Sequence, residues 1–193
     1  MRRPCADAVA GNGPDGPAPT QSRQGWDEGQ AGMQDIAIVE ADLGNPQHQD
    51  AIVHLVDAYA CDPMGGGKAL PEEVRTALIP GLQRHPTTLV FLAWHSATPV
   101  GIAICFVGFS TFLARPLINI HDFAVIPTYR GQGVGRQLLE QVAAKGRALG
   151  CSKLTLEVRA DNYPAQRLYE AVGFDNAASY GGGVQVWFLE KRL

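Results

Sequence analysis

The chain has 193 residues, a formal net charge of −3 and 46% hydrophobic residues. This length predicts one domain with a substantial core. The slightly acidic balance gives no electrostatic reason to expect a nucleic-acid partner, and no apolar run is long enough to predict a membrane span. The four cysteines are scattered without a Cys-x-x-Cys pair, so we expect no metal centre and no disulfide framework, as in a cytoplasmic protein.

The first 34 residues differ in composition from the rest. They are rich in Gly, Pro, Ala, Gln and Asp and show no apolar periodicity. Such a segment cannot bury enough surface to offset its ordering entropy, so residues 1–34 are predicted to be a disordered tail and 35–193 the folded domain. Whether Met1 or Met33 is the natural start is left open.

The remaining chain alternates between strand and helix patterns. Alternation of apolar residues and β-branched runs predict strands, and apolar residues spaced by three and four predict helices. The predicted strands cover 36–39, 88–94, 100–109, 117–125 and 153–158, followed by a closing hairpin that ends with 184–189. The predicted helices cover 50–59, 71–81, 133–149 and a short segment after Asn162. This order predicts an α/β fold.

A glycine-rich turn, Arg-Gly-Gln-Gly-Val-Gly at 130–135, joins a predicted strand to a predicted helix. A turn of this kind presents bare N–H groups at a helix N-terminus, where a phosphate is held. It is not a P-loop, because no Lys-Ser/Thr pair follows Gly135. It is not the dinucleotide fingerprint, because Arg136 stands where the third glycine is needed. The alternative is an ordinary glycine-rich connection.

Two motifs resemble the GCN5-related N-acetyltransferase (GNAT) family. The first is Arg-x-x-Gly-x-Gly at 130–135, and the second is Asn-x-x-Ala-x-x-Leu-Tyr-x-x-x-Gly-Phe at 162–174. The resemblance implies a single domain with a mixed, twisted sheet of about seven strands and about four helices. It also implies acetyl-CoA as co-substrate and no metal. It assigns cofactor contacts to Phe123, Ala124, Val125, Arg130, Gly131, Gln132, Gly133, Val134, Gly135, Arg136 and Asn162.

The resemblance also implies candidate catalytic groups. Tyr169 matches the family's general acid, which protonates the departing thiolate; the alternative is an aromatic packed under the cofactor. The backbone N–H of Phe123 or Val125 would polarise the thioester carbonyl. Asn162 would contact the pantetheine arm, or simply cap a helix.

The strand before the turn carries two further candidates, His121 and Asp122. Strand alternation predicts that their side chains lie on opposite faces. The segment is similar to the diamine acetyltransferase branch, with His121 in place of an acidic residue and Asp122 retained. His121 is a candidate base acting through a water, or a structural residue. Asp122 is a candidate anchor for an ammonium group.

The acceptor side is less defined by the sequence. The resemblance places it at the loop 61–70 and at the last hairpin around 180–183. We expect an N-acetyltransferase that acts on a primary amine of a small molecule or an exposed protein amine. The alternative is a catalytically silent acyl-CoA-binding sensor or assembly module. Assembly as a homodimer is left open.

Overall fold

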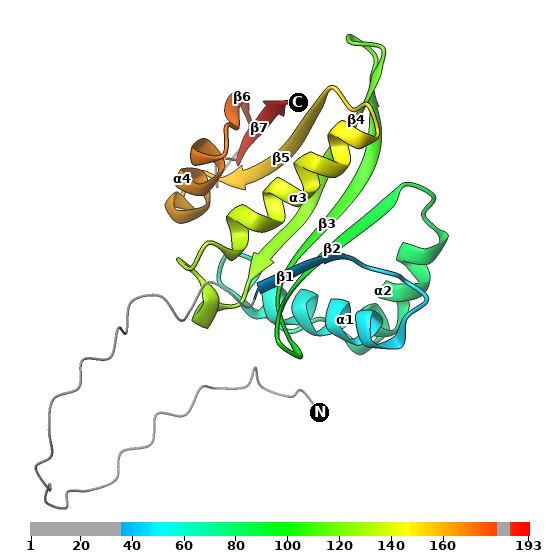
Figure 1. Cartoon of the computed structure of the whole chain (residues 1–193). Helices are drawn as coiled ribbons and strands as arrows, with labels where there is room; N and C mark the ends of the chain where they lie inside the picture. Colours follow the sequence, from blue (N-terminus) through cyan, green and yellow to red (C-terminus); the bar gives the residue numbers. More distant parts are fainter. Residues whose placement is uncertain (1–35, 181–185) are drawn as a thin grey trace, which may run out of the picture.

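A computed structural model describes residues 36–180 and 186–193, and the predicted N-terminal tail lies outside them (Figure 1). The described chain forms seven strands, four α-helices and one 3₁₀-helix, which confirms the predicted composition and order of elements. In chain order they are β1 (Ile36–Glu40), α1 (Pro46–Cys61), α2 (Glu72–Arg84), β2 (Thr88–His95), β3 (Thr98–Ser110), β4 (Arg115–Val125), η1 (Pro127–Tyr129), α3 (Val134–Ala148), β5 (Lys153–Arg159), α4 (Tyr163–Ala171), β6 (Asp175–Tyr180) and β7 (Val186–Arg192).

The strands form one mixed sheet in the order β1-β2-β3-β4-β5-β7-β6. Every pair of neighbours is antiparallel except β4 and β5, which are parallel. A parallel pair needs a crossover connection, and α3 supplies it between β4 and β5. The turn at 130–135 is therefore the entrance to this crossover.

Helices cover both faces of the sheet and divide the core into two clusters. One face packs against α3 and α4, through residues such as Leu138, Leu139 and Tyr169. The other face packs against α1 and α2, through residues such as Ile52 and Leu82. Figure 1 shows α3 crossing one face while α1 and α2 lie together at the other. A residue's place in one cluster or the other therefore tells which face its side chain occupies.

Two helix boundaries differ from the sequence prediction. α1 begins at Pro46 rather than near Asp50, because Asn45 caps it by accepting a hydrogen bond from the Gln47 N–H at 2.9 Å. α2 continues past Pro80 to Arg84, although the sequence predicted an end near residue 81. Packing of the buried Ile79 and Leu82 against the sheet outweighs the low helix propensity of the Pro-Gly pair.

Candidate active site

The parallel strands β4 and β5 part halfway along their length. They pair only at residues 118–120 and 154–156, although β4 runs on to Val125 and β5 to Arg159. Beyond this point β5 stays paired with β7, and β4 stays paired with β3. The facing edges of β4 and β5 are therefore left without each other's hydrogen bonds beyond this point. We call this stretch of unpaired strand edge the opening; the start of α3 lies beside it, because Gly135 of α3 approaches the Phe123 ring of β4.

Two residues of β4 direct their backbone groups into this opening. The Ile126 N–H donates to the Val100 carbonyl of β3 at 3.0 Å. Because residues of an antiparallel ladder face their partner alternately, Ala124 also bonds β3, whereas Phe123 and Val125 face the other way. The Val125 carbonyl accepts a hydrogen bond from Arg130 Nε at 2.9 Å, which agrees with this direction. The free edge thus offers the Phe123 N–H and carbonyl and the Val125 N–H.

The glycine turn presents further free N–H groups beside the same opening. Gly131 and Gly133 have φ values of 76° and 81°, a conformation that other residues adopt only with strain. Gly133 is the N-cap of α3, and the first hydrogen bond of this helix runs from the Gln137 N–H to the Gly133 carbonyl. The N–H groups of residues 134–136 therefore have no partner within the helix, as an anion site requires.

Gly135 is required for packing as well. A Cβ at this position would lie 2.9 Å from Leu168 Cδ2 of α4 and 3.6 Å from the Phe123 ring of β4. The first turn of α3 is therefore seated directly against both elements. Arg136, in the same turn, is exposed and forms no ion pair within the described residues. A cation here is unfavourable beside the positive end of the helix dipole unless an anion also binds.

The side chains of the turn brace its backbone. Gln132 Nε2 donates to the Thr128 carbonyl at 2.8 Å, and Arg130 bonds Val125 as described above. The hydroxyl of Tyr129, in η1, lies 2.7 Å from His95 Nδ1 at the end of β2. The turn that carries the free N–H groups is therefore held in place by hydrogen bonds from its own side chains and from the preceding 3₁₀-helix.

Tyr169, on α4, lies beside Phe123 of β4. Its side chain is only 5% exposed, and its ring contacts those of Phe123 and Phe174 at centroid distances of 6.0 Å and 5.8 Å. No described residue hydrogen-bonds its hydroxyl. Burial raises the pKa of this phenol well above its usual value, and the neighbouring Tyr59 adds to the shift. Tyr169 therefore keeps its proton across the physiological range.

His121 and Asp122 lie on the same face of the sheet, so the predicted placement on opposite faces is wrong. The pairing of β4 with β3 slips by one residue at this point, with Ile120 opposite Cys105 and Asp122 opposite Ile104. Such a β-bulge gives two residues of one strand a single partner and interrupts the alternation. His121 stacks edge-on against Phe106, at 5.6 Å, on the α1 and α2 face. Asp122 lies on this face too, because its neighbour Phe123 packs on the opposite one.

The two groups differ in their exposure to water. His121 is exposed, whereas Asp122 is partly buried. Burial raises the pKa of the Asp122 carboxyl, and the nearby His121 only partly opposes this shift. A carboxyl group with a raised pKa next to an imidazole is a pair suited to accepting a proton.

Tyr59, near the end of α1, is a site residue that the sequence analysis missed. Burial raises the pKa of its phenol, and the carboxylates of Asp122 and Asp62 raise it further, while Arg159 opposes them. Tyr59 thus interacts electrostatically with Asp122 of β4, Arg159 of β5 and Tyr169 of α4. Its spacing within α1 marked it only as a packing residue. The feature of the sequence that could have indicated a role for Tyr59 in the site is its position two residues before the predicted acceptor loop at 61–70.

Two parts of the predicted site remain, namely Asn162 and the second predicted acceptor segment at 180–183. Asn162 is the N-cap of α4, and its Oδ1 accepts a hydrogen bond from the Ala165 N–H at 3.3 Å. The structure thus supports its capping role directly. The hairpin tip predicted at 180–183 lies outside the residues whose side chains the structure describes. Within the described part of the chain, no cluster of three or more His, Cys, Asp or Glu side chains could hold a metal ion.

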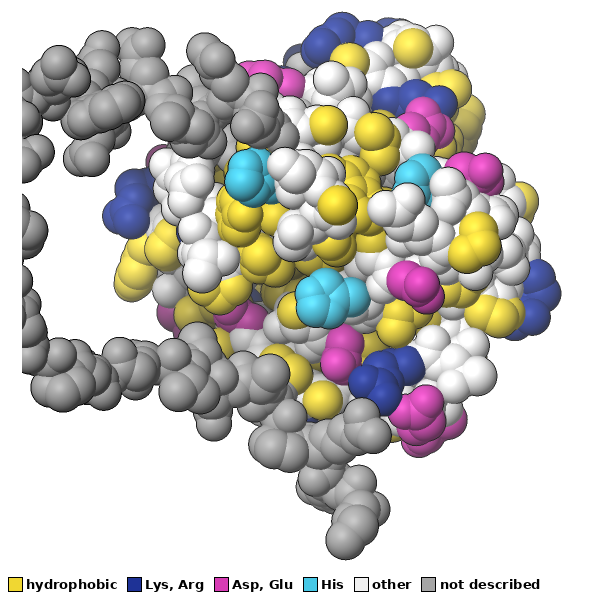
Figure 2. All heavy atoms as spheres, turned by 60° about the horizontal axis from the view of Figure 1, so that its bottom comes forward, with side chains coloured by type: hydrophobic (Ala, Val, Ile, Leu, Met, Phe, Trp, Pro, Cys, Tyr) yellow, Lys and Arg dark blue, Asp and Glu magenta, His cyan; other side chains and the backbone are white. Residues whose placement is uncertain are grey.

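The surface around α1 and α2 is chemically mixed. Figure 2 shows apolar side chains between scattered histidine, acidic and basic ones, with no continuous field of Lys and Arg on this face. Among the helices of the described residues, none is long and apolar enough to cross a membrane.

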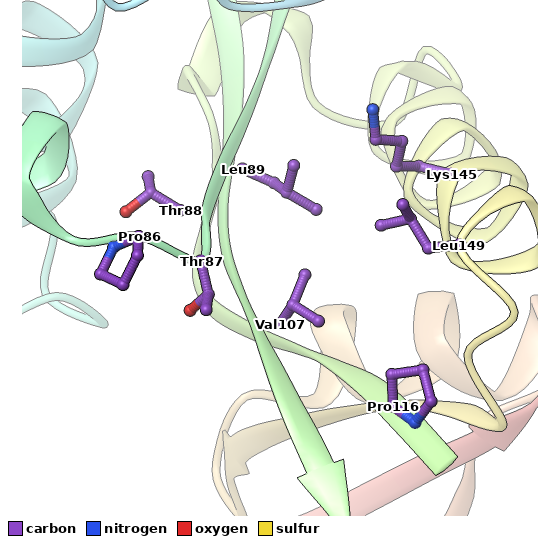
Figure 3. A pocket seen from close by; sticks show the side chains of 8 residues that line it. All are labelled: Pro86, Thr87, Thr88, Leu89, Val107, Pro116, Lys145 and Leu149. Atoms are coloured by element: carbon purple, nitrogen blue, oxygen red, sulfur yellow. The ribbon is translucent and has the colours of Figure 1, made fainter.

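A separate groove of about 400 Å³ lies at the other end of α3. The side chains of Leu89, Val107 and Leu149 point into it, together with the stem of Lys145 (Figure 3). The ammonium group of Lys145 is paired with Glu40 at 2.8 Å. None of the predicted site residues lines this groove, so it is distinct from the opening between β4 and β5.

Sequence comparison assigns the family. Residues 53–174 match the profile described as "Acetyltransferase (GNAT) family". The chain is 39% identical over 74 residues to thialysine N-ε-acetyltransferase of Bos taurus, covering 38% of this chain and 43% of that protein. It is 45% identical over 59 residues to the [ribosomal protein bS18]-alanine N-acetyltransferase of Escherichia coli K12, covering 31% of this chain and 40% of that one. The matched segments thus span about two fifths of these curated relatives.

Solved structures share the fold. The protein yncA of Salmonella typhimurium, solved with its cofactor acetyl-CoA, superimposes with a TM-score of 0.64 at 20% identity, covering 83% of this chain and 95% of that one. The ribosomal-protein-S18-alanine N-acetyltransferase of Escherichia coli superimposes with a TM-score of 0.61 at 22% identity, covering 81% and 93%. The chain therefore belongs to the GNAT family and has its fold, as the two motifs predicted.

Proposed function

We propose that this chain transfers the acetyl group of acetyl-CoA to a primary amine of a small molecule or an exposed protein amine. The amine attacks the thioester directly while both substrates are bound. The observation that carries the proposal is the opening between β4 and β5, which lies in front of the unpaired N–H groups at the start of α3. A polar backbone edge beside a helix N-terminus suits a cofactor that has an amide-containing arm and a pyrophosphate.

In this proposal most of the cofactor is held by backbone groups. The N–H groups of residues 131–136 bind the pyrophosphate, and the exposed Arg136 adds a positive charge. Phe123 and Val125 bond the pantetheine amides, and the N–H nearest the thioester stabilises negative charge on its carbonyl oxygen. Ala124 lines the same strand, and Asn162 adds a contact from the start of α4. Arg130 and Gln132 contribute through their backbone, because their side chains brace the turn.

The described side chains divide the handling of protons. An amine reaches the site as an ammonium group, which the Asp122 carboxylate attracts. His121, on the same face, accepts the amine's proton through a water. Tyr169, which burial keeps protonated, donates a proton to the departing thiolate of CoA. The thiolate, with a reference pKa of about 8.5, is a weaker base than ordinary phenolate at about 10, so this last transfer needs the geometry of the site to favour it.

The relatives indicate which acceptors to test first. The names of the two curated relatives specify the ε-amine of thialysine and an alanine amine of a ribosomal protein. Both are primary amines, but one belongs to a free amino acid and the other to a protein. The carboxylate of Asp122 favours a cationic acceptor in either case.

The test is a titration with acetyl-CoA followed by a panel of amines. Calorimetry measures cofactor affinity, and thiol release measures transfer to thialysine, lysine, a diamine and a peptide that begins with alanine. We expect binding of acetyl-CoA and amine-dependent thiol release with at least one member. Binding without transfer to any primary amine would instead support the silent acyl-CoA-binding alternative. Absence of binding would refute both.

A further inference from the structure

Asp62, directly after α1, organises the loop on the acceptor side. Its backbone carbonyl accepts hydrogen bonds from the N–H groups of Gly65, Gly66 and Gly67 at 2.8, 3.0 and 3.0 Å. Its carboxylate Oδ1 accepts a further bond from the Met64 N–H at 2.8 Å. Four consecutive N–H groups of a glycine-rich loop are thus directed at one residue. The loop has a defined path because it winds around Asp62.

The other carboxylate oxygen of Asp62 reaches the glycine turn at 130–135. Asp62 Oδ2 lies 2.7 Å from Arg130 Nη2, and the Asp62 side chain is only 12% exposed. Partial burial alone would raise the pKa of Asp62, but the hydrogen bonds from Arg130 and the Met64 N–H outweigh it and hold this pKa below its usual value. The carboxylate is therefore charged at neutral pH, and the ion pair is present.

Arg130 bonds two elements at the same time. While Nη2 binds Asp62, Nε donates to the carbonyl of Val125, the last residue of β4. A guanidinium can do this because its donors diverge from a rigid plane, whereas the ammonium of a lysine acts as a single point charge. The side chain of Arg130, a predicted cofactor contact, thus joins the loop after α1 to β4, the strand that borders the opening.

The path of the loop also fixes Tyr59. A Cβ on Gly65 would lie 1.9 Å from the Tyr59 carbonyl oxygen and 3.2 Å from its ring atom Cδ2. The loop therefore folds tightly over Tyr59, whose phenol interacts with Asp122. Movement of the loop would displace a group beside the proposed ammonium anchor.

We propose that Asp62 and Arg130 are a positioning pair, here called the clasp, that holds residues 62–68 of the predicted acceptor loop (61–70) against the glycine turn at 130–135. The roles of the two joined parts rest on the proposed function, but the clasp itself rests on the contacts above. The ion pair thereby connects the loop proposed to bind the amine with the turn proposed to bind acetyl-CoA. Neither residue needs to touch the reacting atoms.

Hydrogen exchange of the ligand-free protein tests the clasp without any assay of activity. Asp62→Asn keeps an acceptor for the Met64 N–H but removes the charge, and Arg130→Gln removes the other partner. We expect the amides of residues 64–68 to exchange about fivefold or more faster in both variants, because the loop then opens locally. The matched control is Glu40→Gln, which breaks the ion pair with Lys145 (2.8 Å) away from the site and should leave these amides unchanged. Unchanged exchange in both clasp variants would overturn the proposal.

Kinetics with the best amine of the panel tests positioning. We expect Asp62→Asn to raise the KM for the amine about tenfold, with kcat and the Kd for acetyl-CoA changing less than about twofold. A loosened loop with an unchanged amine KM would overturn the positioning role. If no amine is acetylated, the proposed function fails, and the exchange experiment still decides whether the clasp exists.

Discussion

Replacing Tyr169 with phenylalanine removes one hydroxyl from a buried ring and little else. The contacts of the ring with Phe123 and Phe174 remain, and no described residue bonds the hydroxyl. We therefore expect the free energy of unfolding to change by less than about 1 kcal/mol. Tyr169→Ala, by contrast, removes the whole ring from the core and should cost about 3–5 kcal/mol. The phenylalanine variant thus separates chemistry from packing.

The expected effect of Tyr169→Phe is on turnover. Losing one proton-transfer group commonly lowers the rate by about 10²–10⁴-fold. A thiolate already leaves well, so we expect a fall in kcat of roughly ten- to a thousandfold, with the Kd for acetyl-CoA unchanged within about twofold. Thiol release gives kcat, and calorimetry gives Kd. Because burial raises the pKa of Tyr169, its acid form persists as pH rises, and this residue should produce no loss of activity below about pH 10.

A second tyrosine on the same helix provides the control. Tyr163, the first residue of α4, is 63% exposed, so Tyr163→Phe should leave kcat and Kd unchanged. Full turnover in a folded Tyr169→Phe variant would refute the role of Tyr169 as general acid. Its ring would then serve only to pack the core. Equal losses in both variants would show that the assay reports damage to α4 rather than proton transfer.

Three further substitutions test the turn and the proton pair. Gly135→Glu should abolish acetyl-CoA binding as measured by calorimetry, because a Cβ there would lie 2.9 Å from Leu168 and the carboxylate would repel phosphate. The control is Gly81→Ala, which has no atom within 4 Å of the new Cβ and should bind acetyl-CoA normally. Burial raises the pKa of Asp122 in the folded protein above its value of about 4 in the unfolded chain. As pH rises from about 4 through the raised pKa, ionisation of Asp122 therefore lowers the free energy of unfolding. In urea unfolding at pH 7, Asp122→Asn should therefore be more stable than the unsubstituted protein, and this difference should vanish below about pH 4. The same substitution should raise the KM for the amine. A less stable Asp122→Asn variant at pH 7 would contradict this reasoning. His121→Ala should lower kcat/KM for the amine by about 10²-fold or more, and a full rate in that variant together with a large loss in Asp122→Asn would move the base to the carboxylate.

Local features of the sequence determined much of this protein. Periodicity is a property of neighbouring residues, and it predicted the order of all eleven helices and strands that the sequence analysis proposed. The turn at 130–135 could also be predicted from the sequence, because a positive φ at Gly131 and Gly133 is a local steric requirement. Family membership followed from two such local motifs in the right order. The errors at helix ends, near Asp50 and residue 81, arose where a cap or a distant contact outweighed propensity.

Only the tertiary structure decided how these pieces form a site. The bulge that turns His121 and Asp122 to one face depends on the register of β4 against β3, and a strand's own sequence does not fix that register. The parting of β4 from β5 is a property of two strands that α3 separates in the chain. The Asp62–Arg130 pair joins residues 68 positions apart. These features arise from long-range packing and pairing, which a pattern read along the chain does not contain.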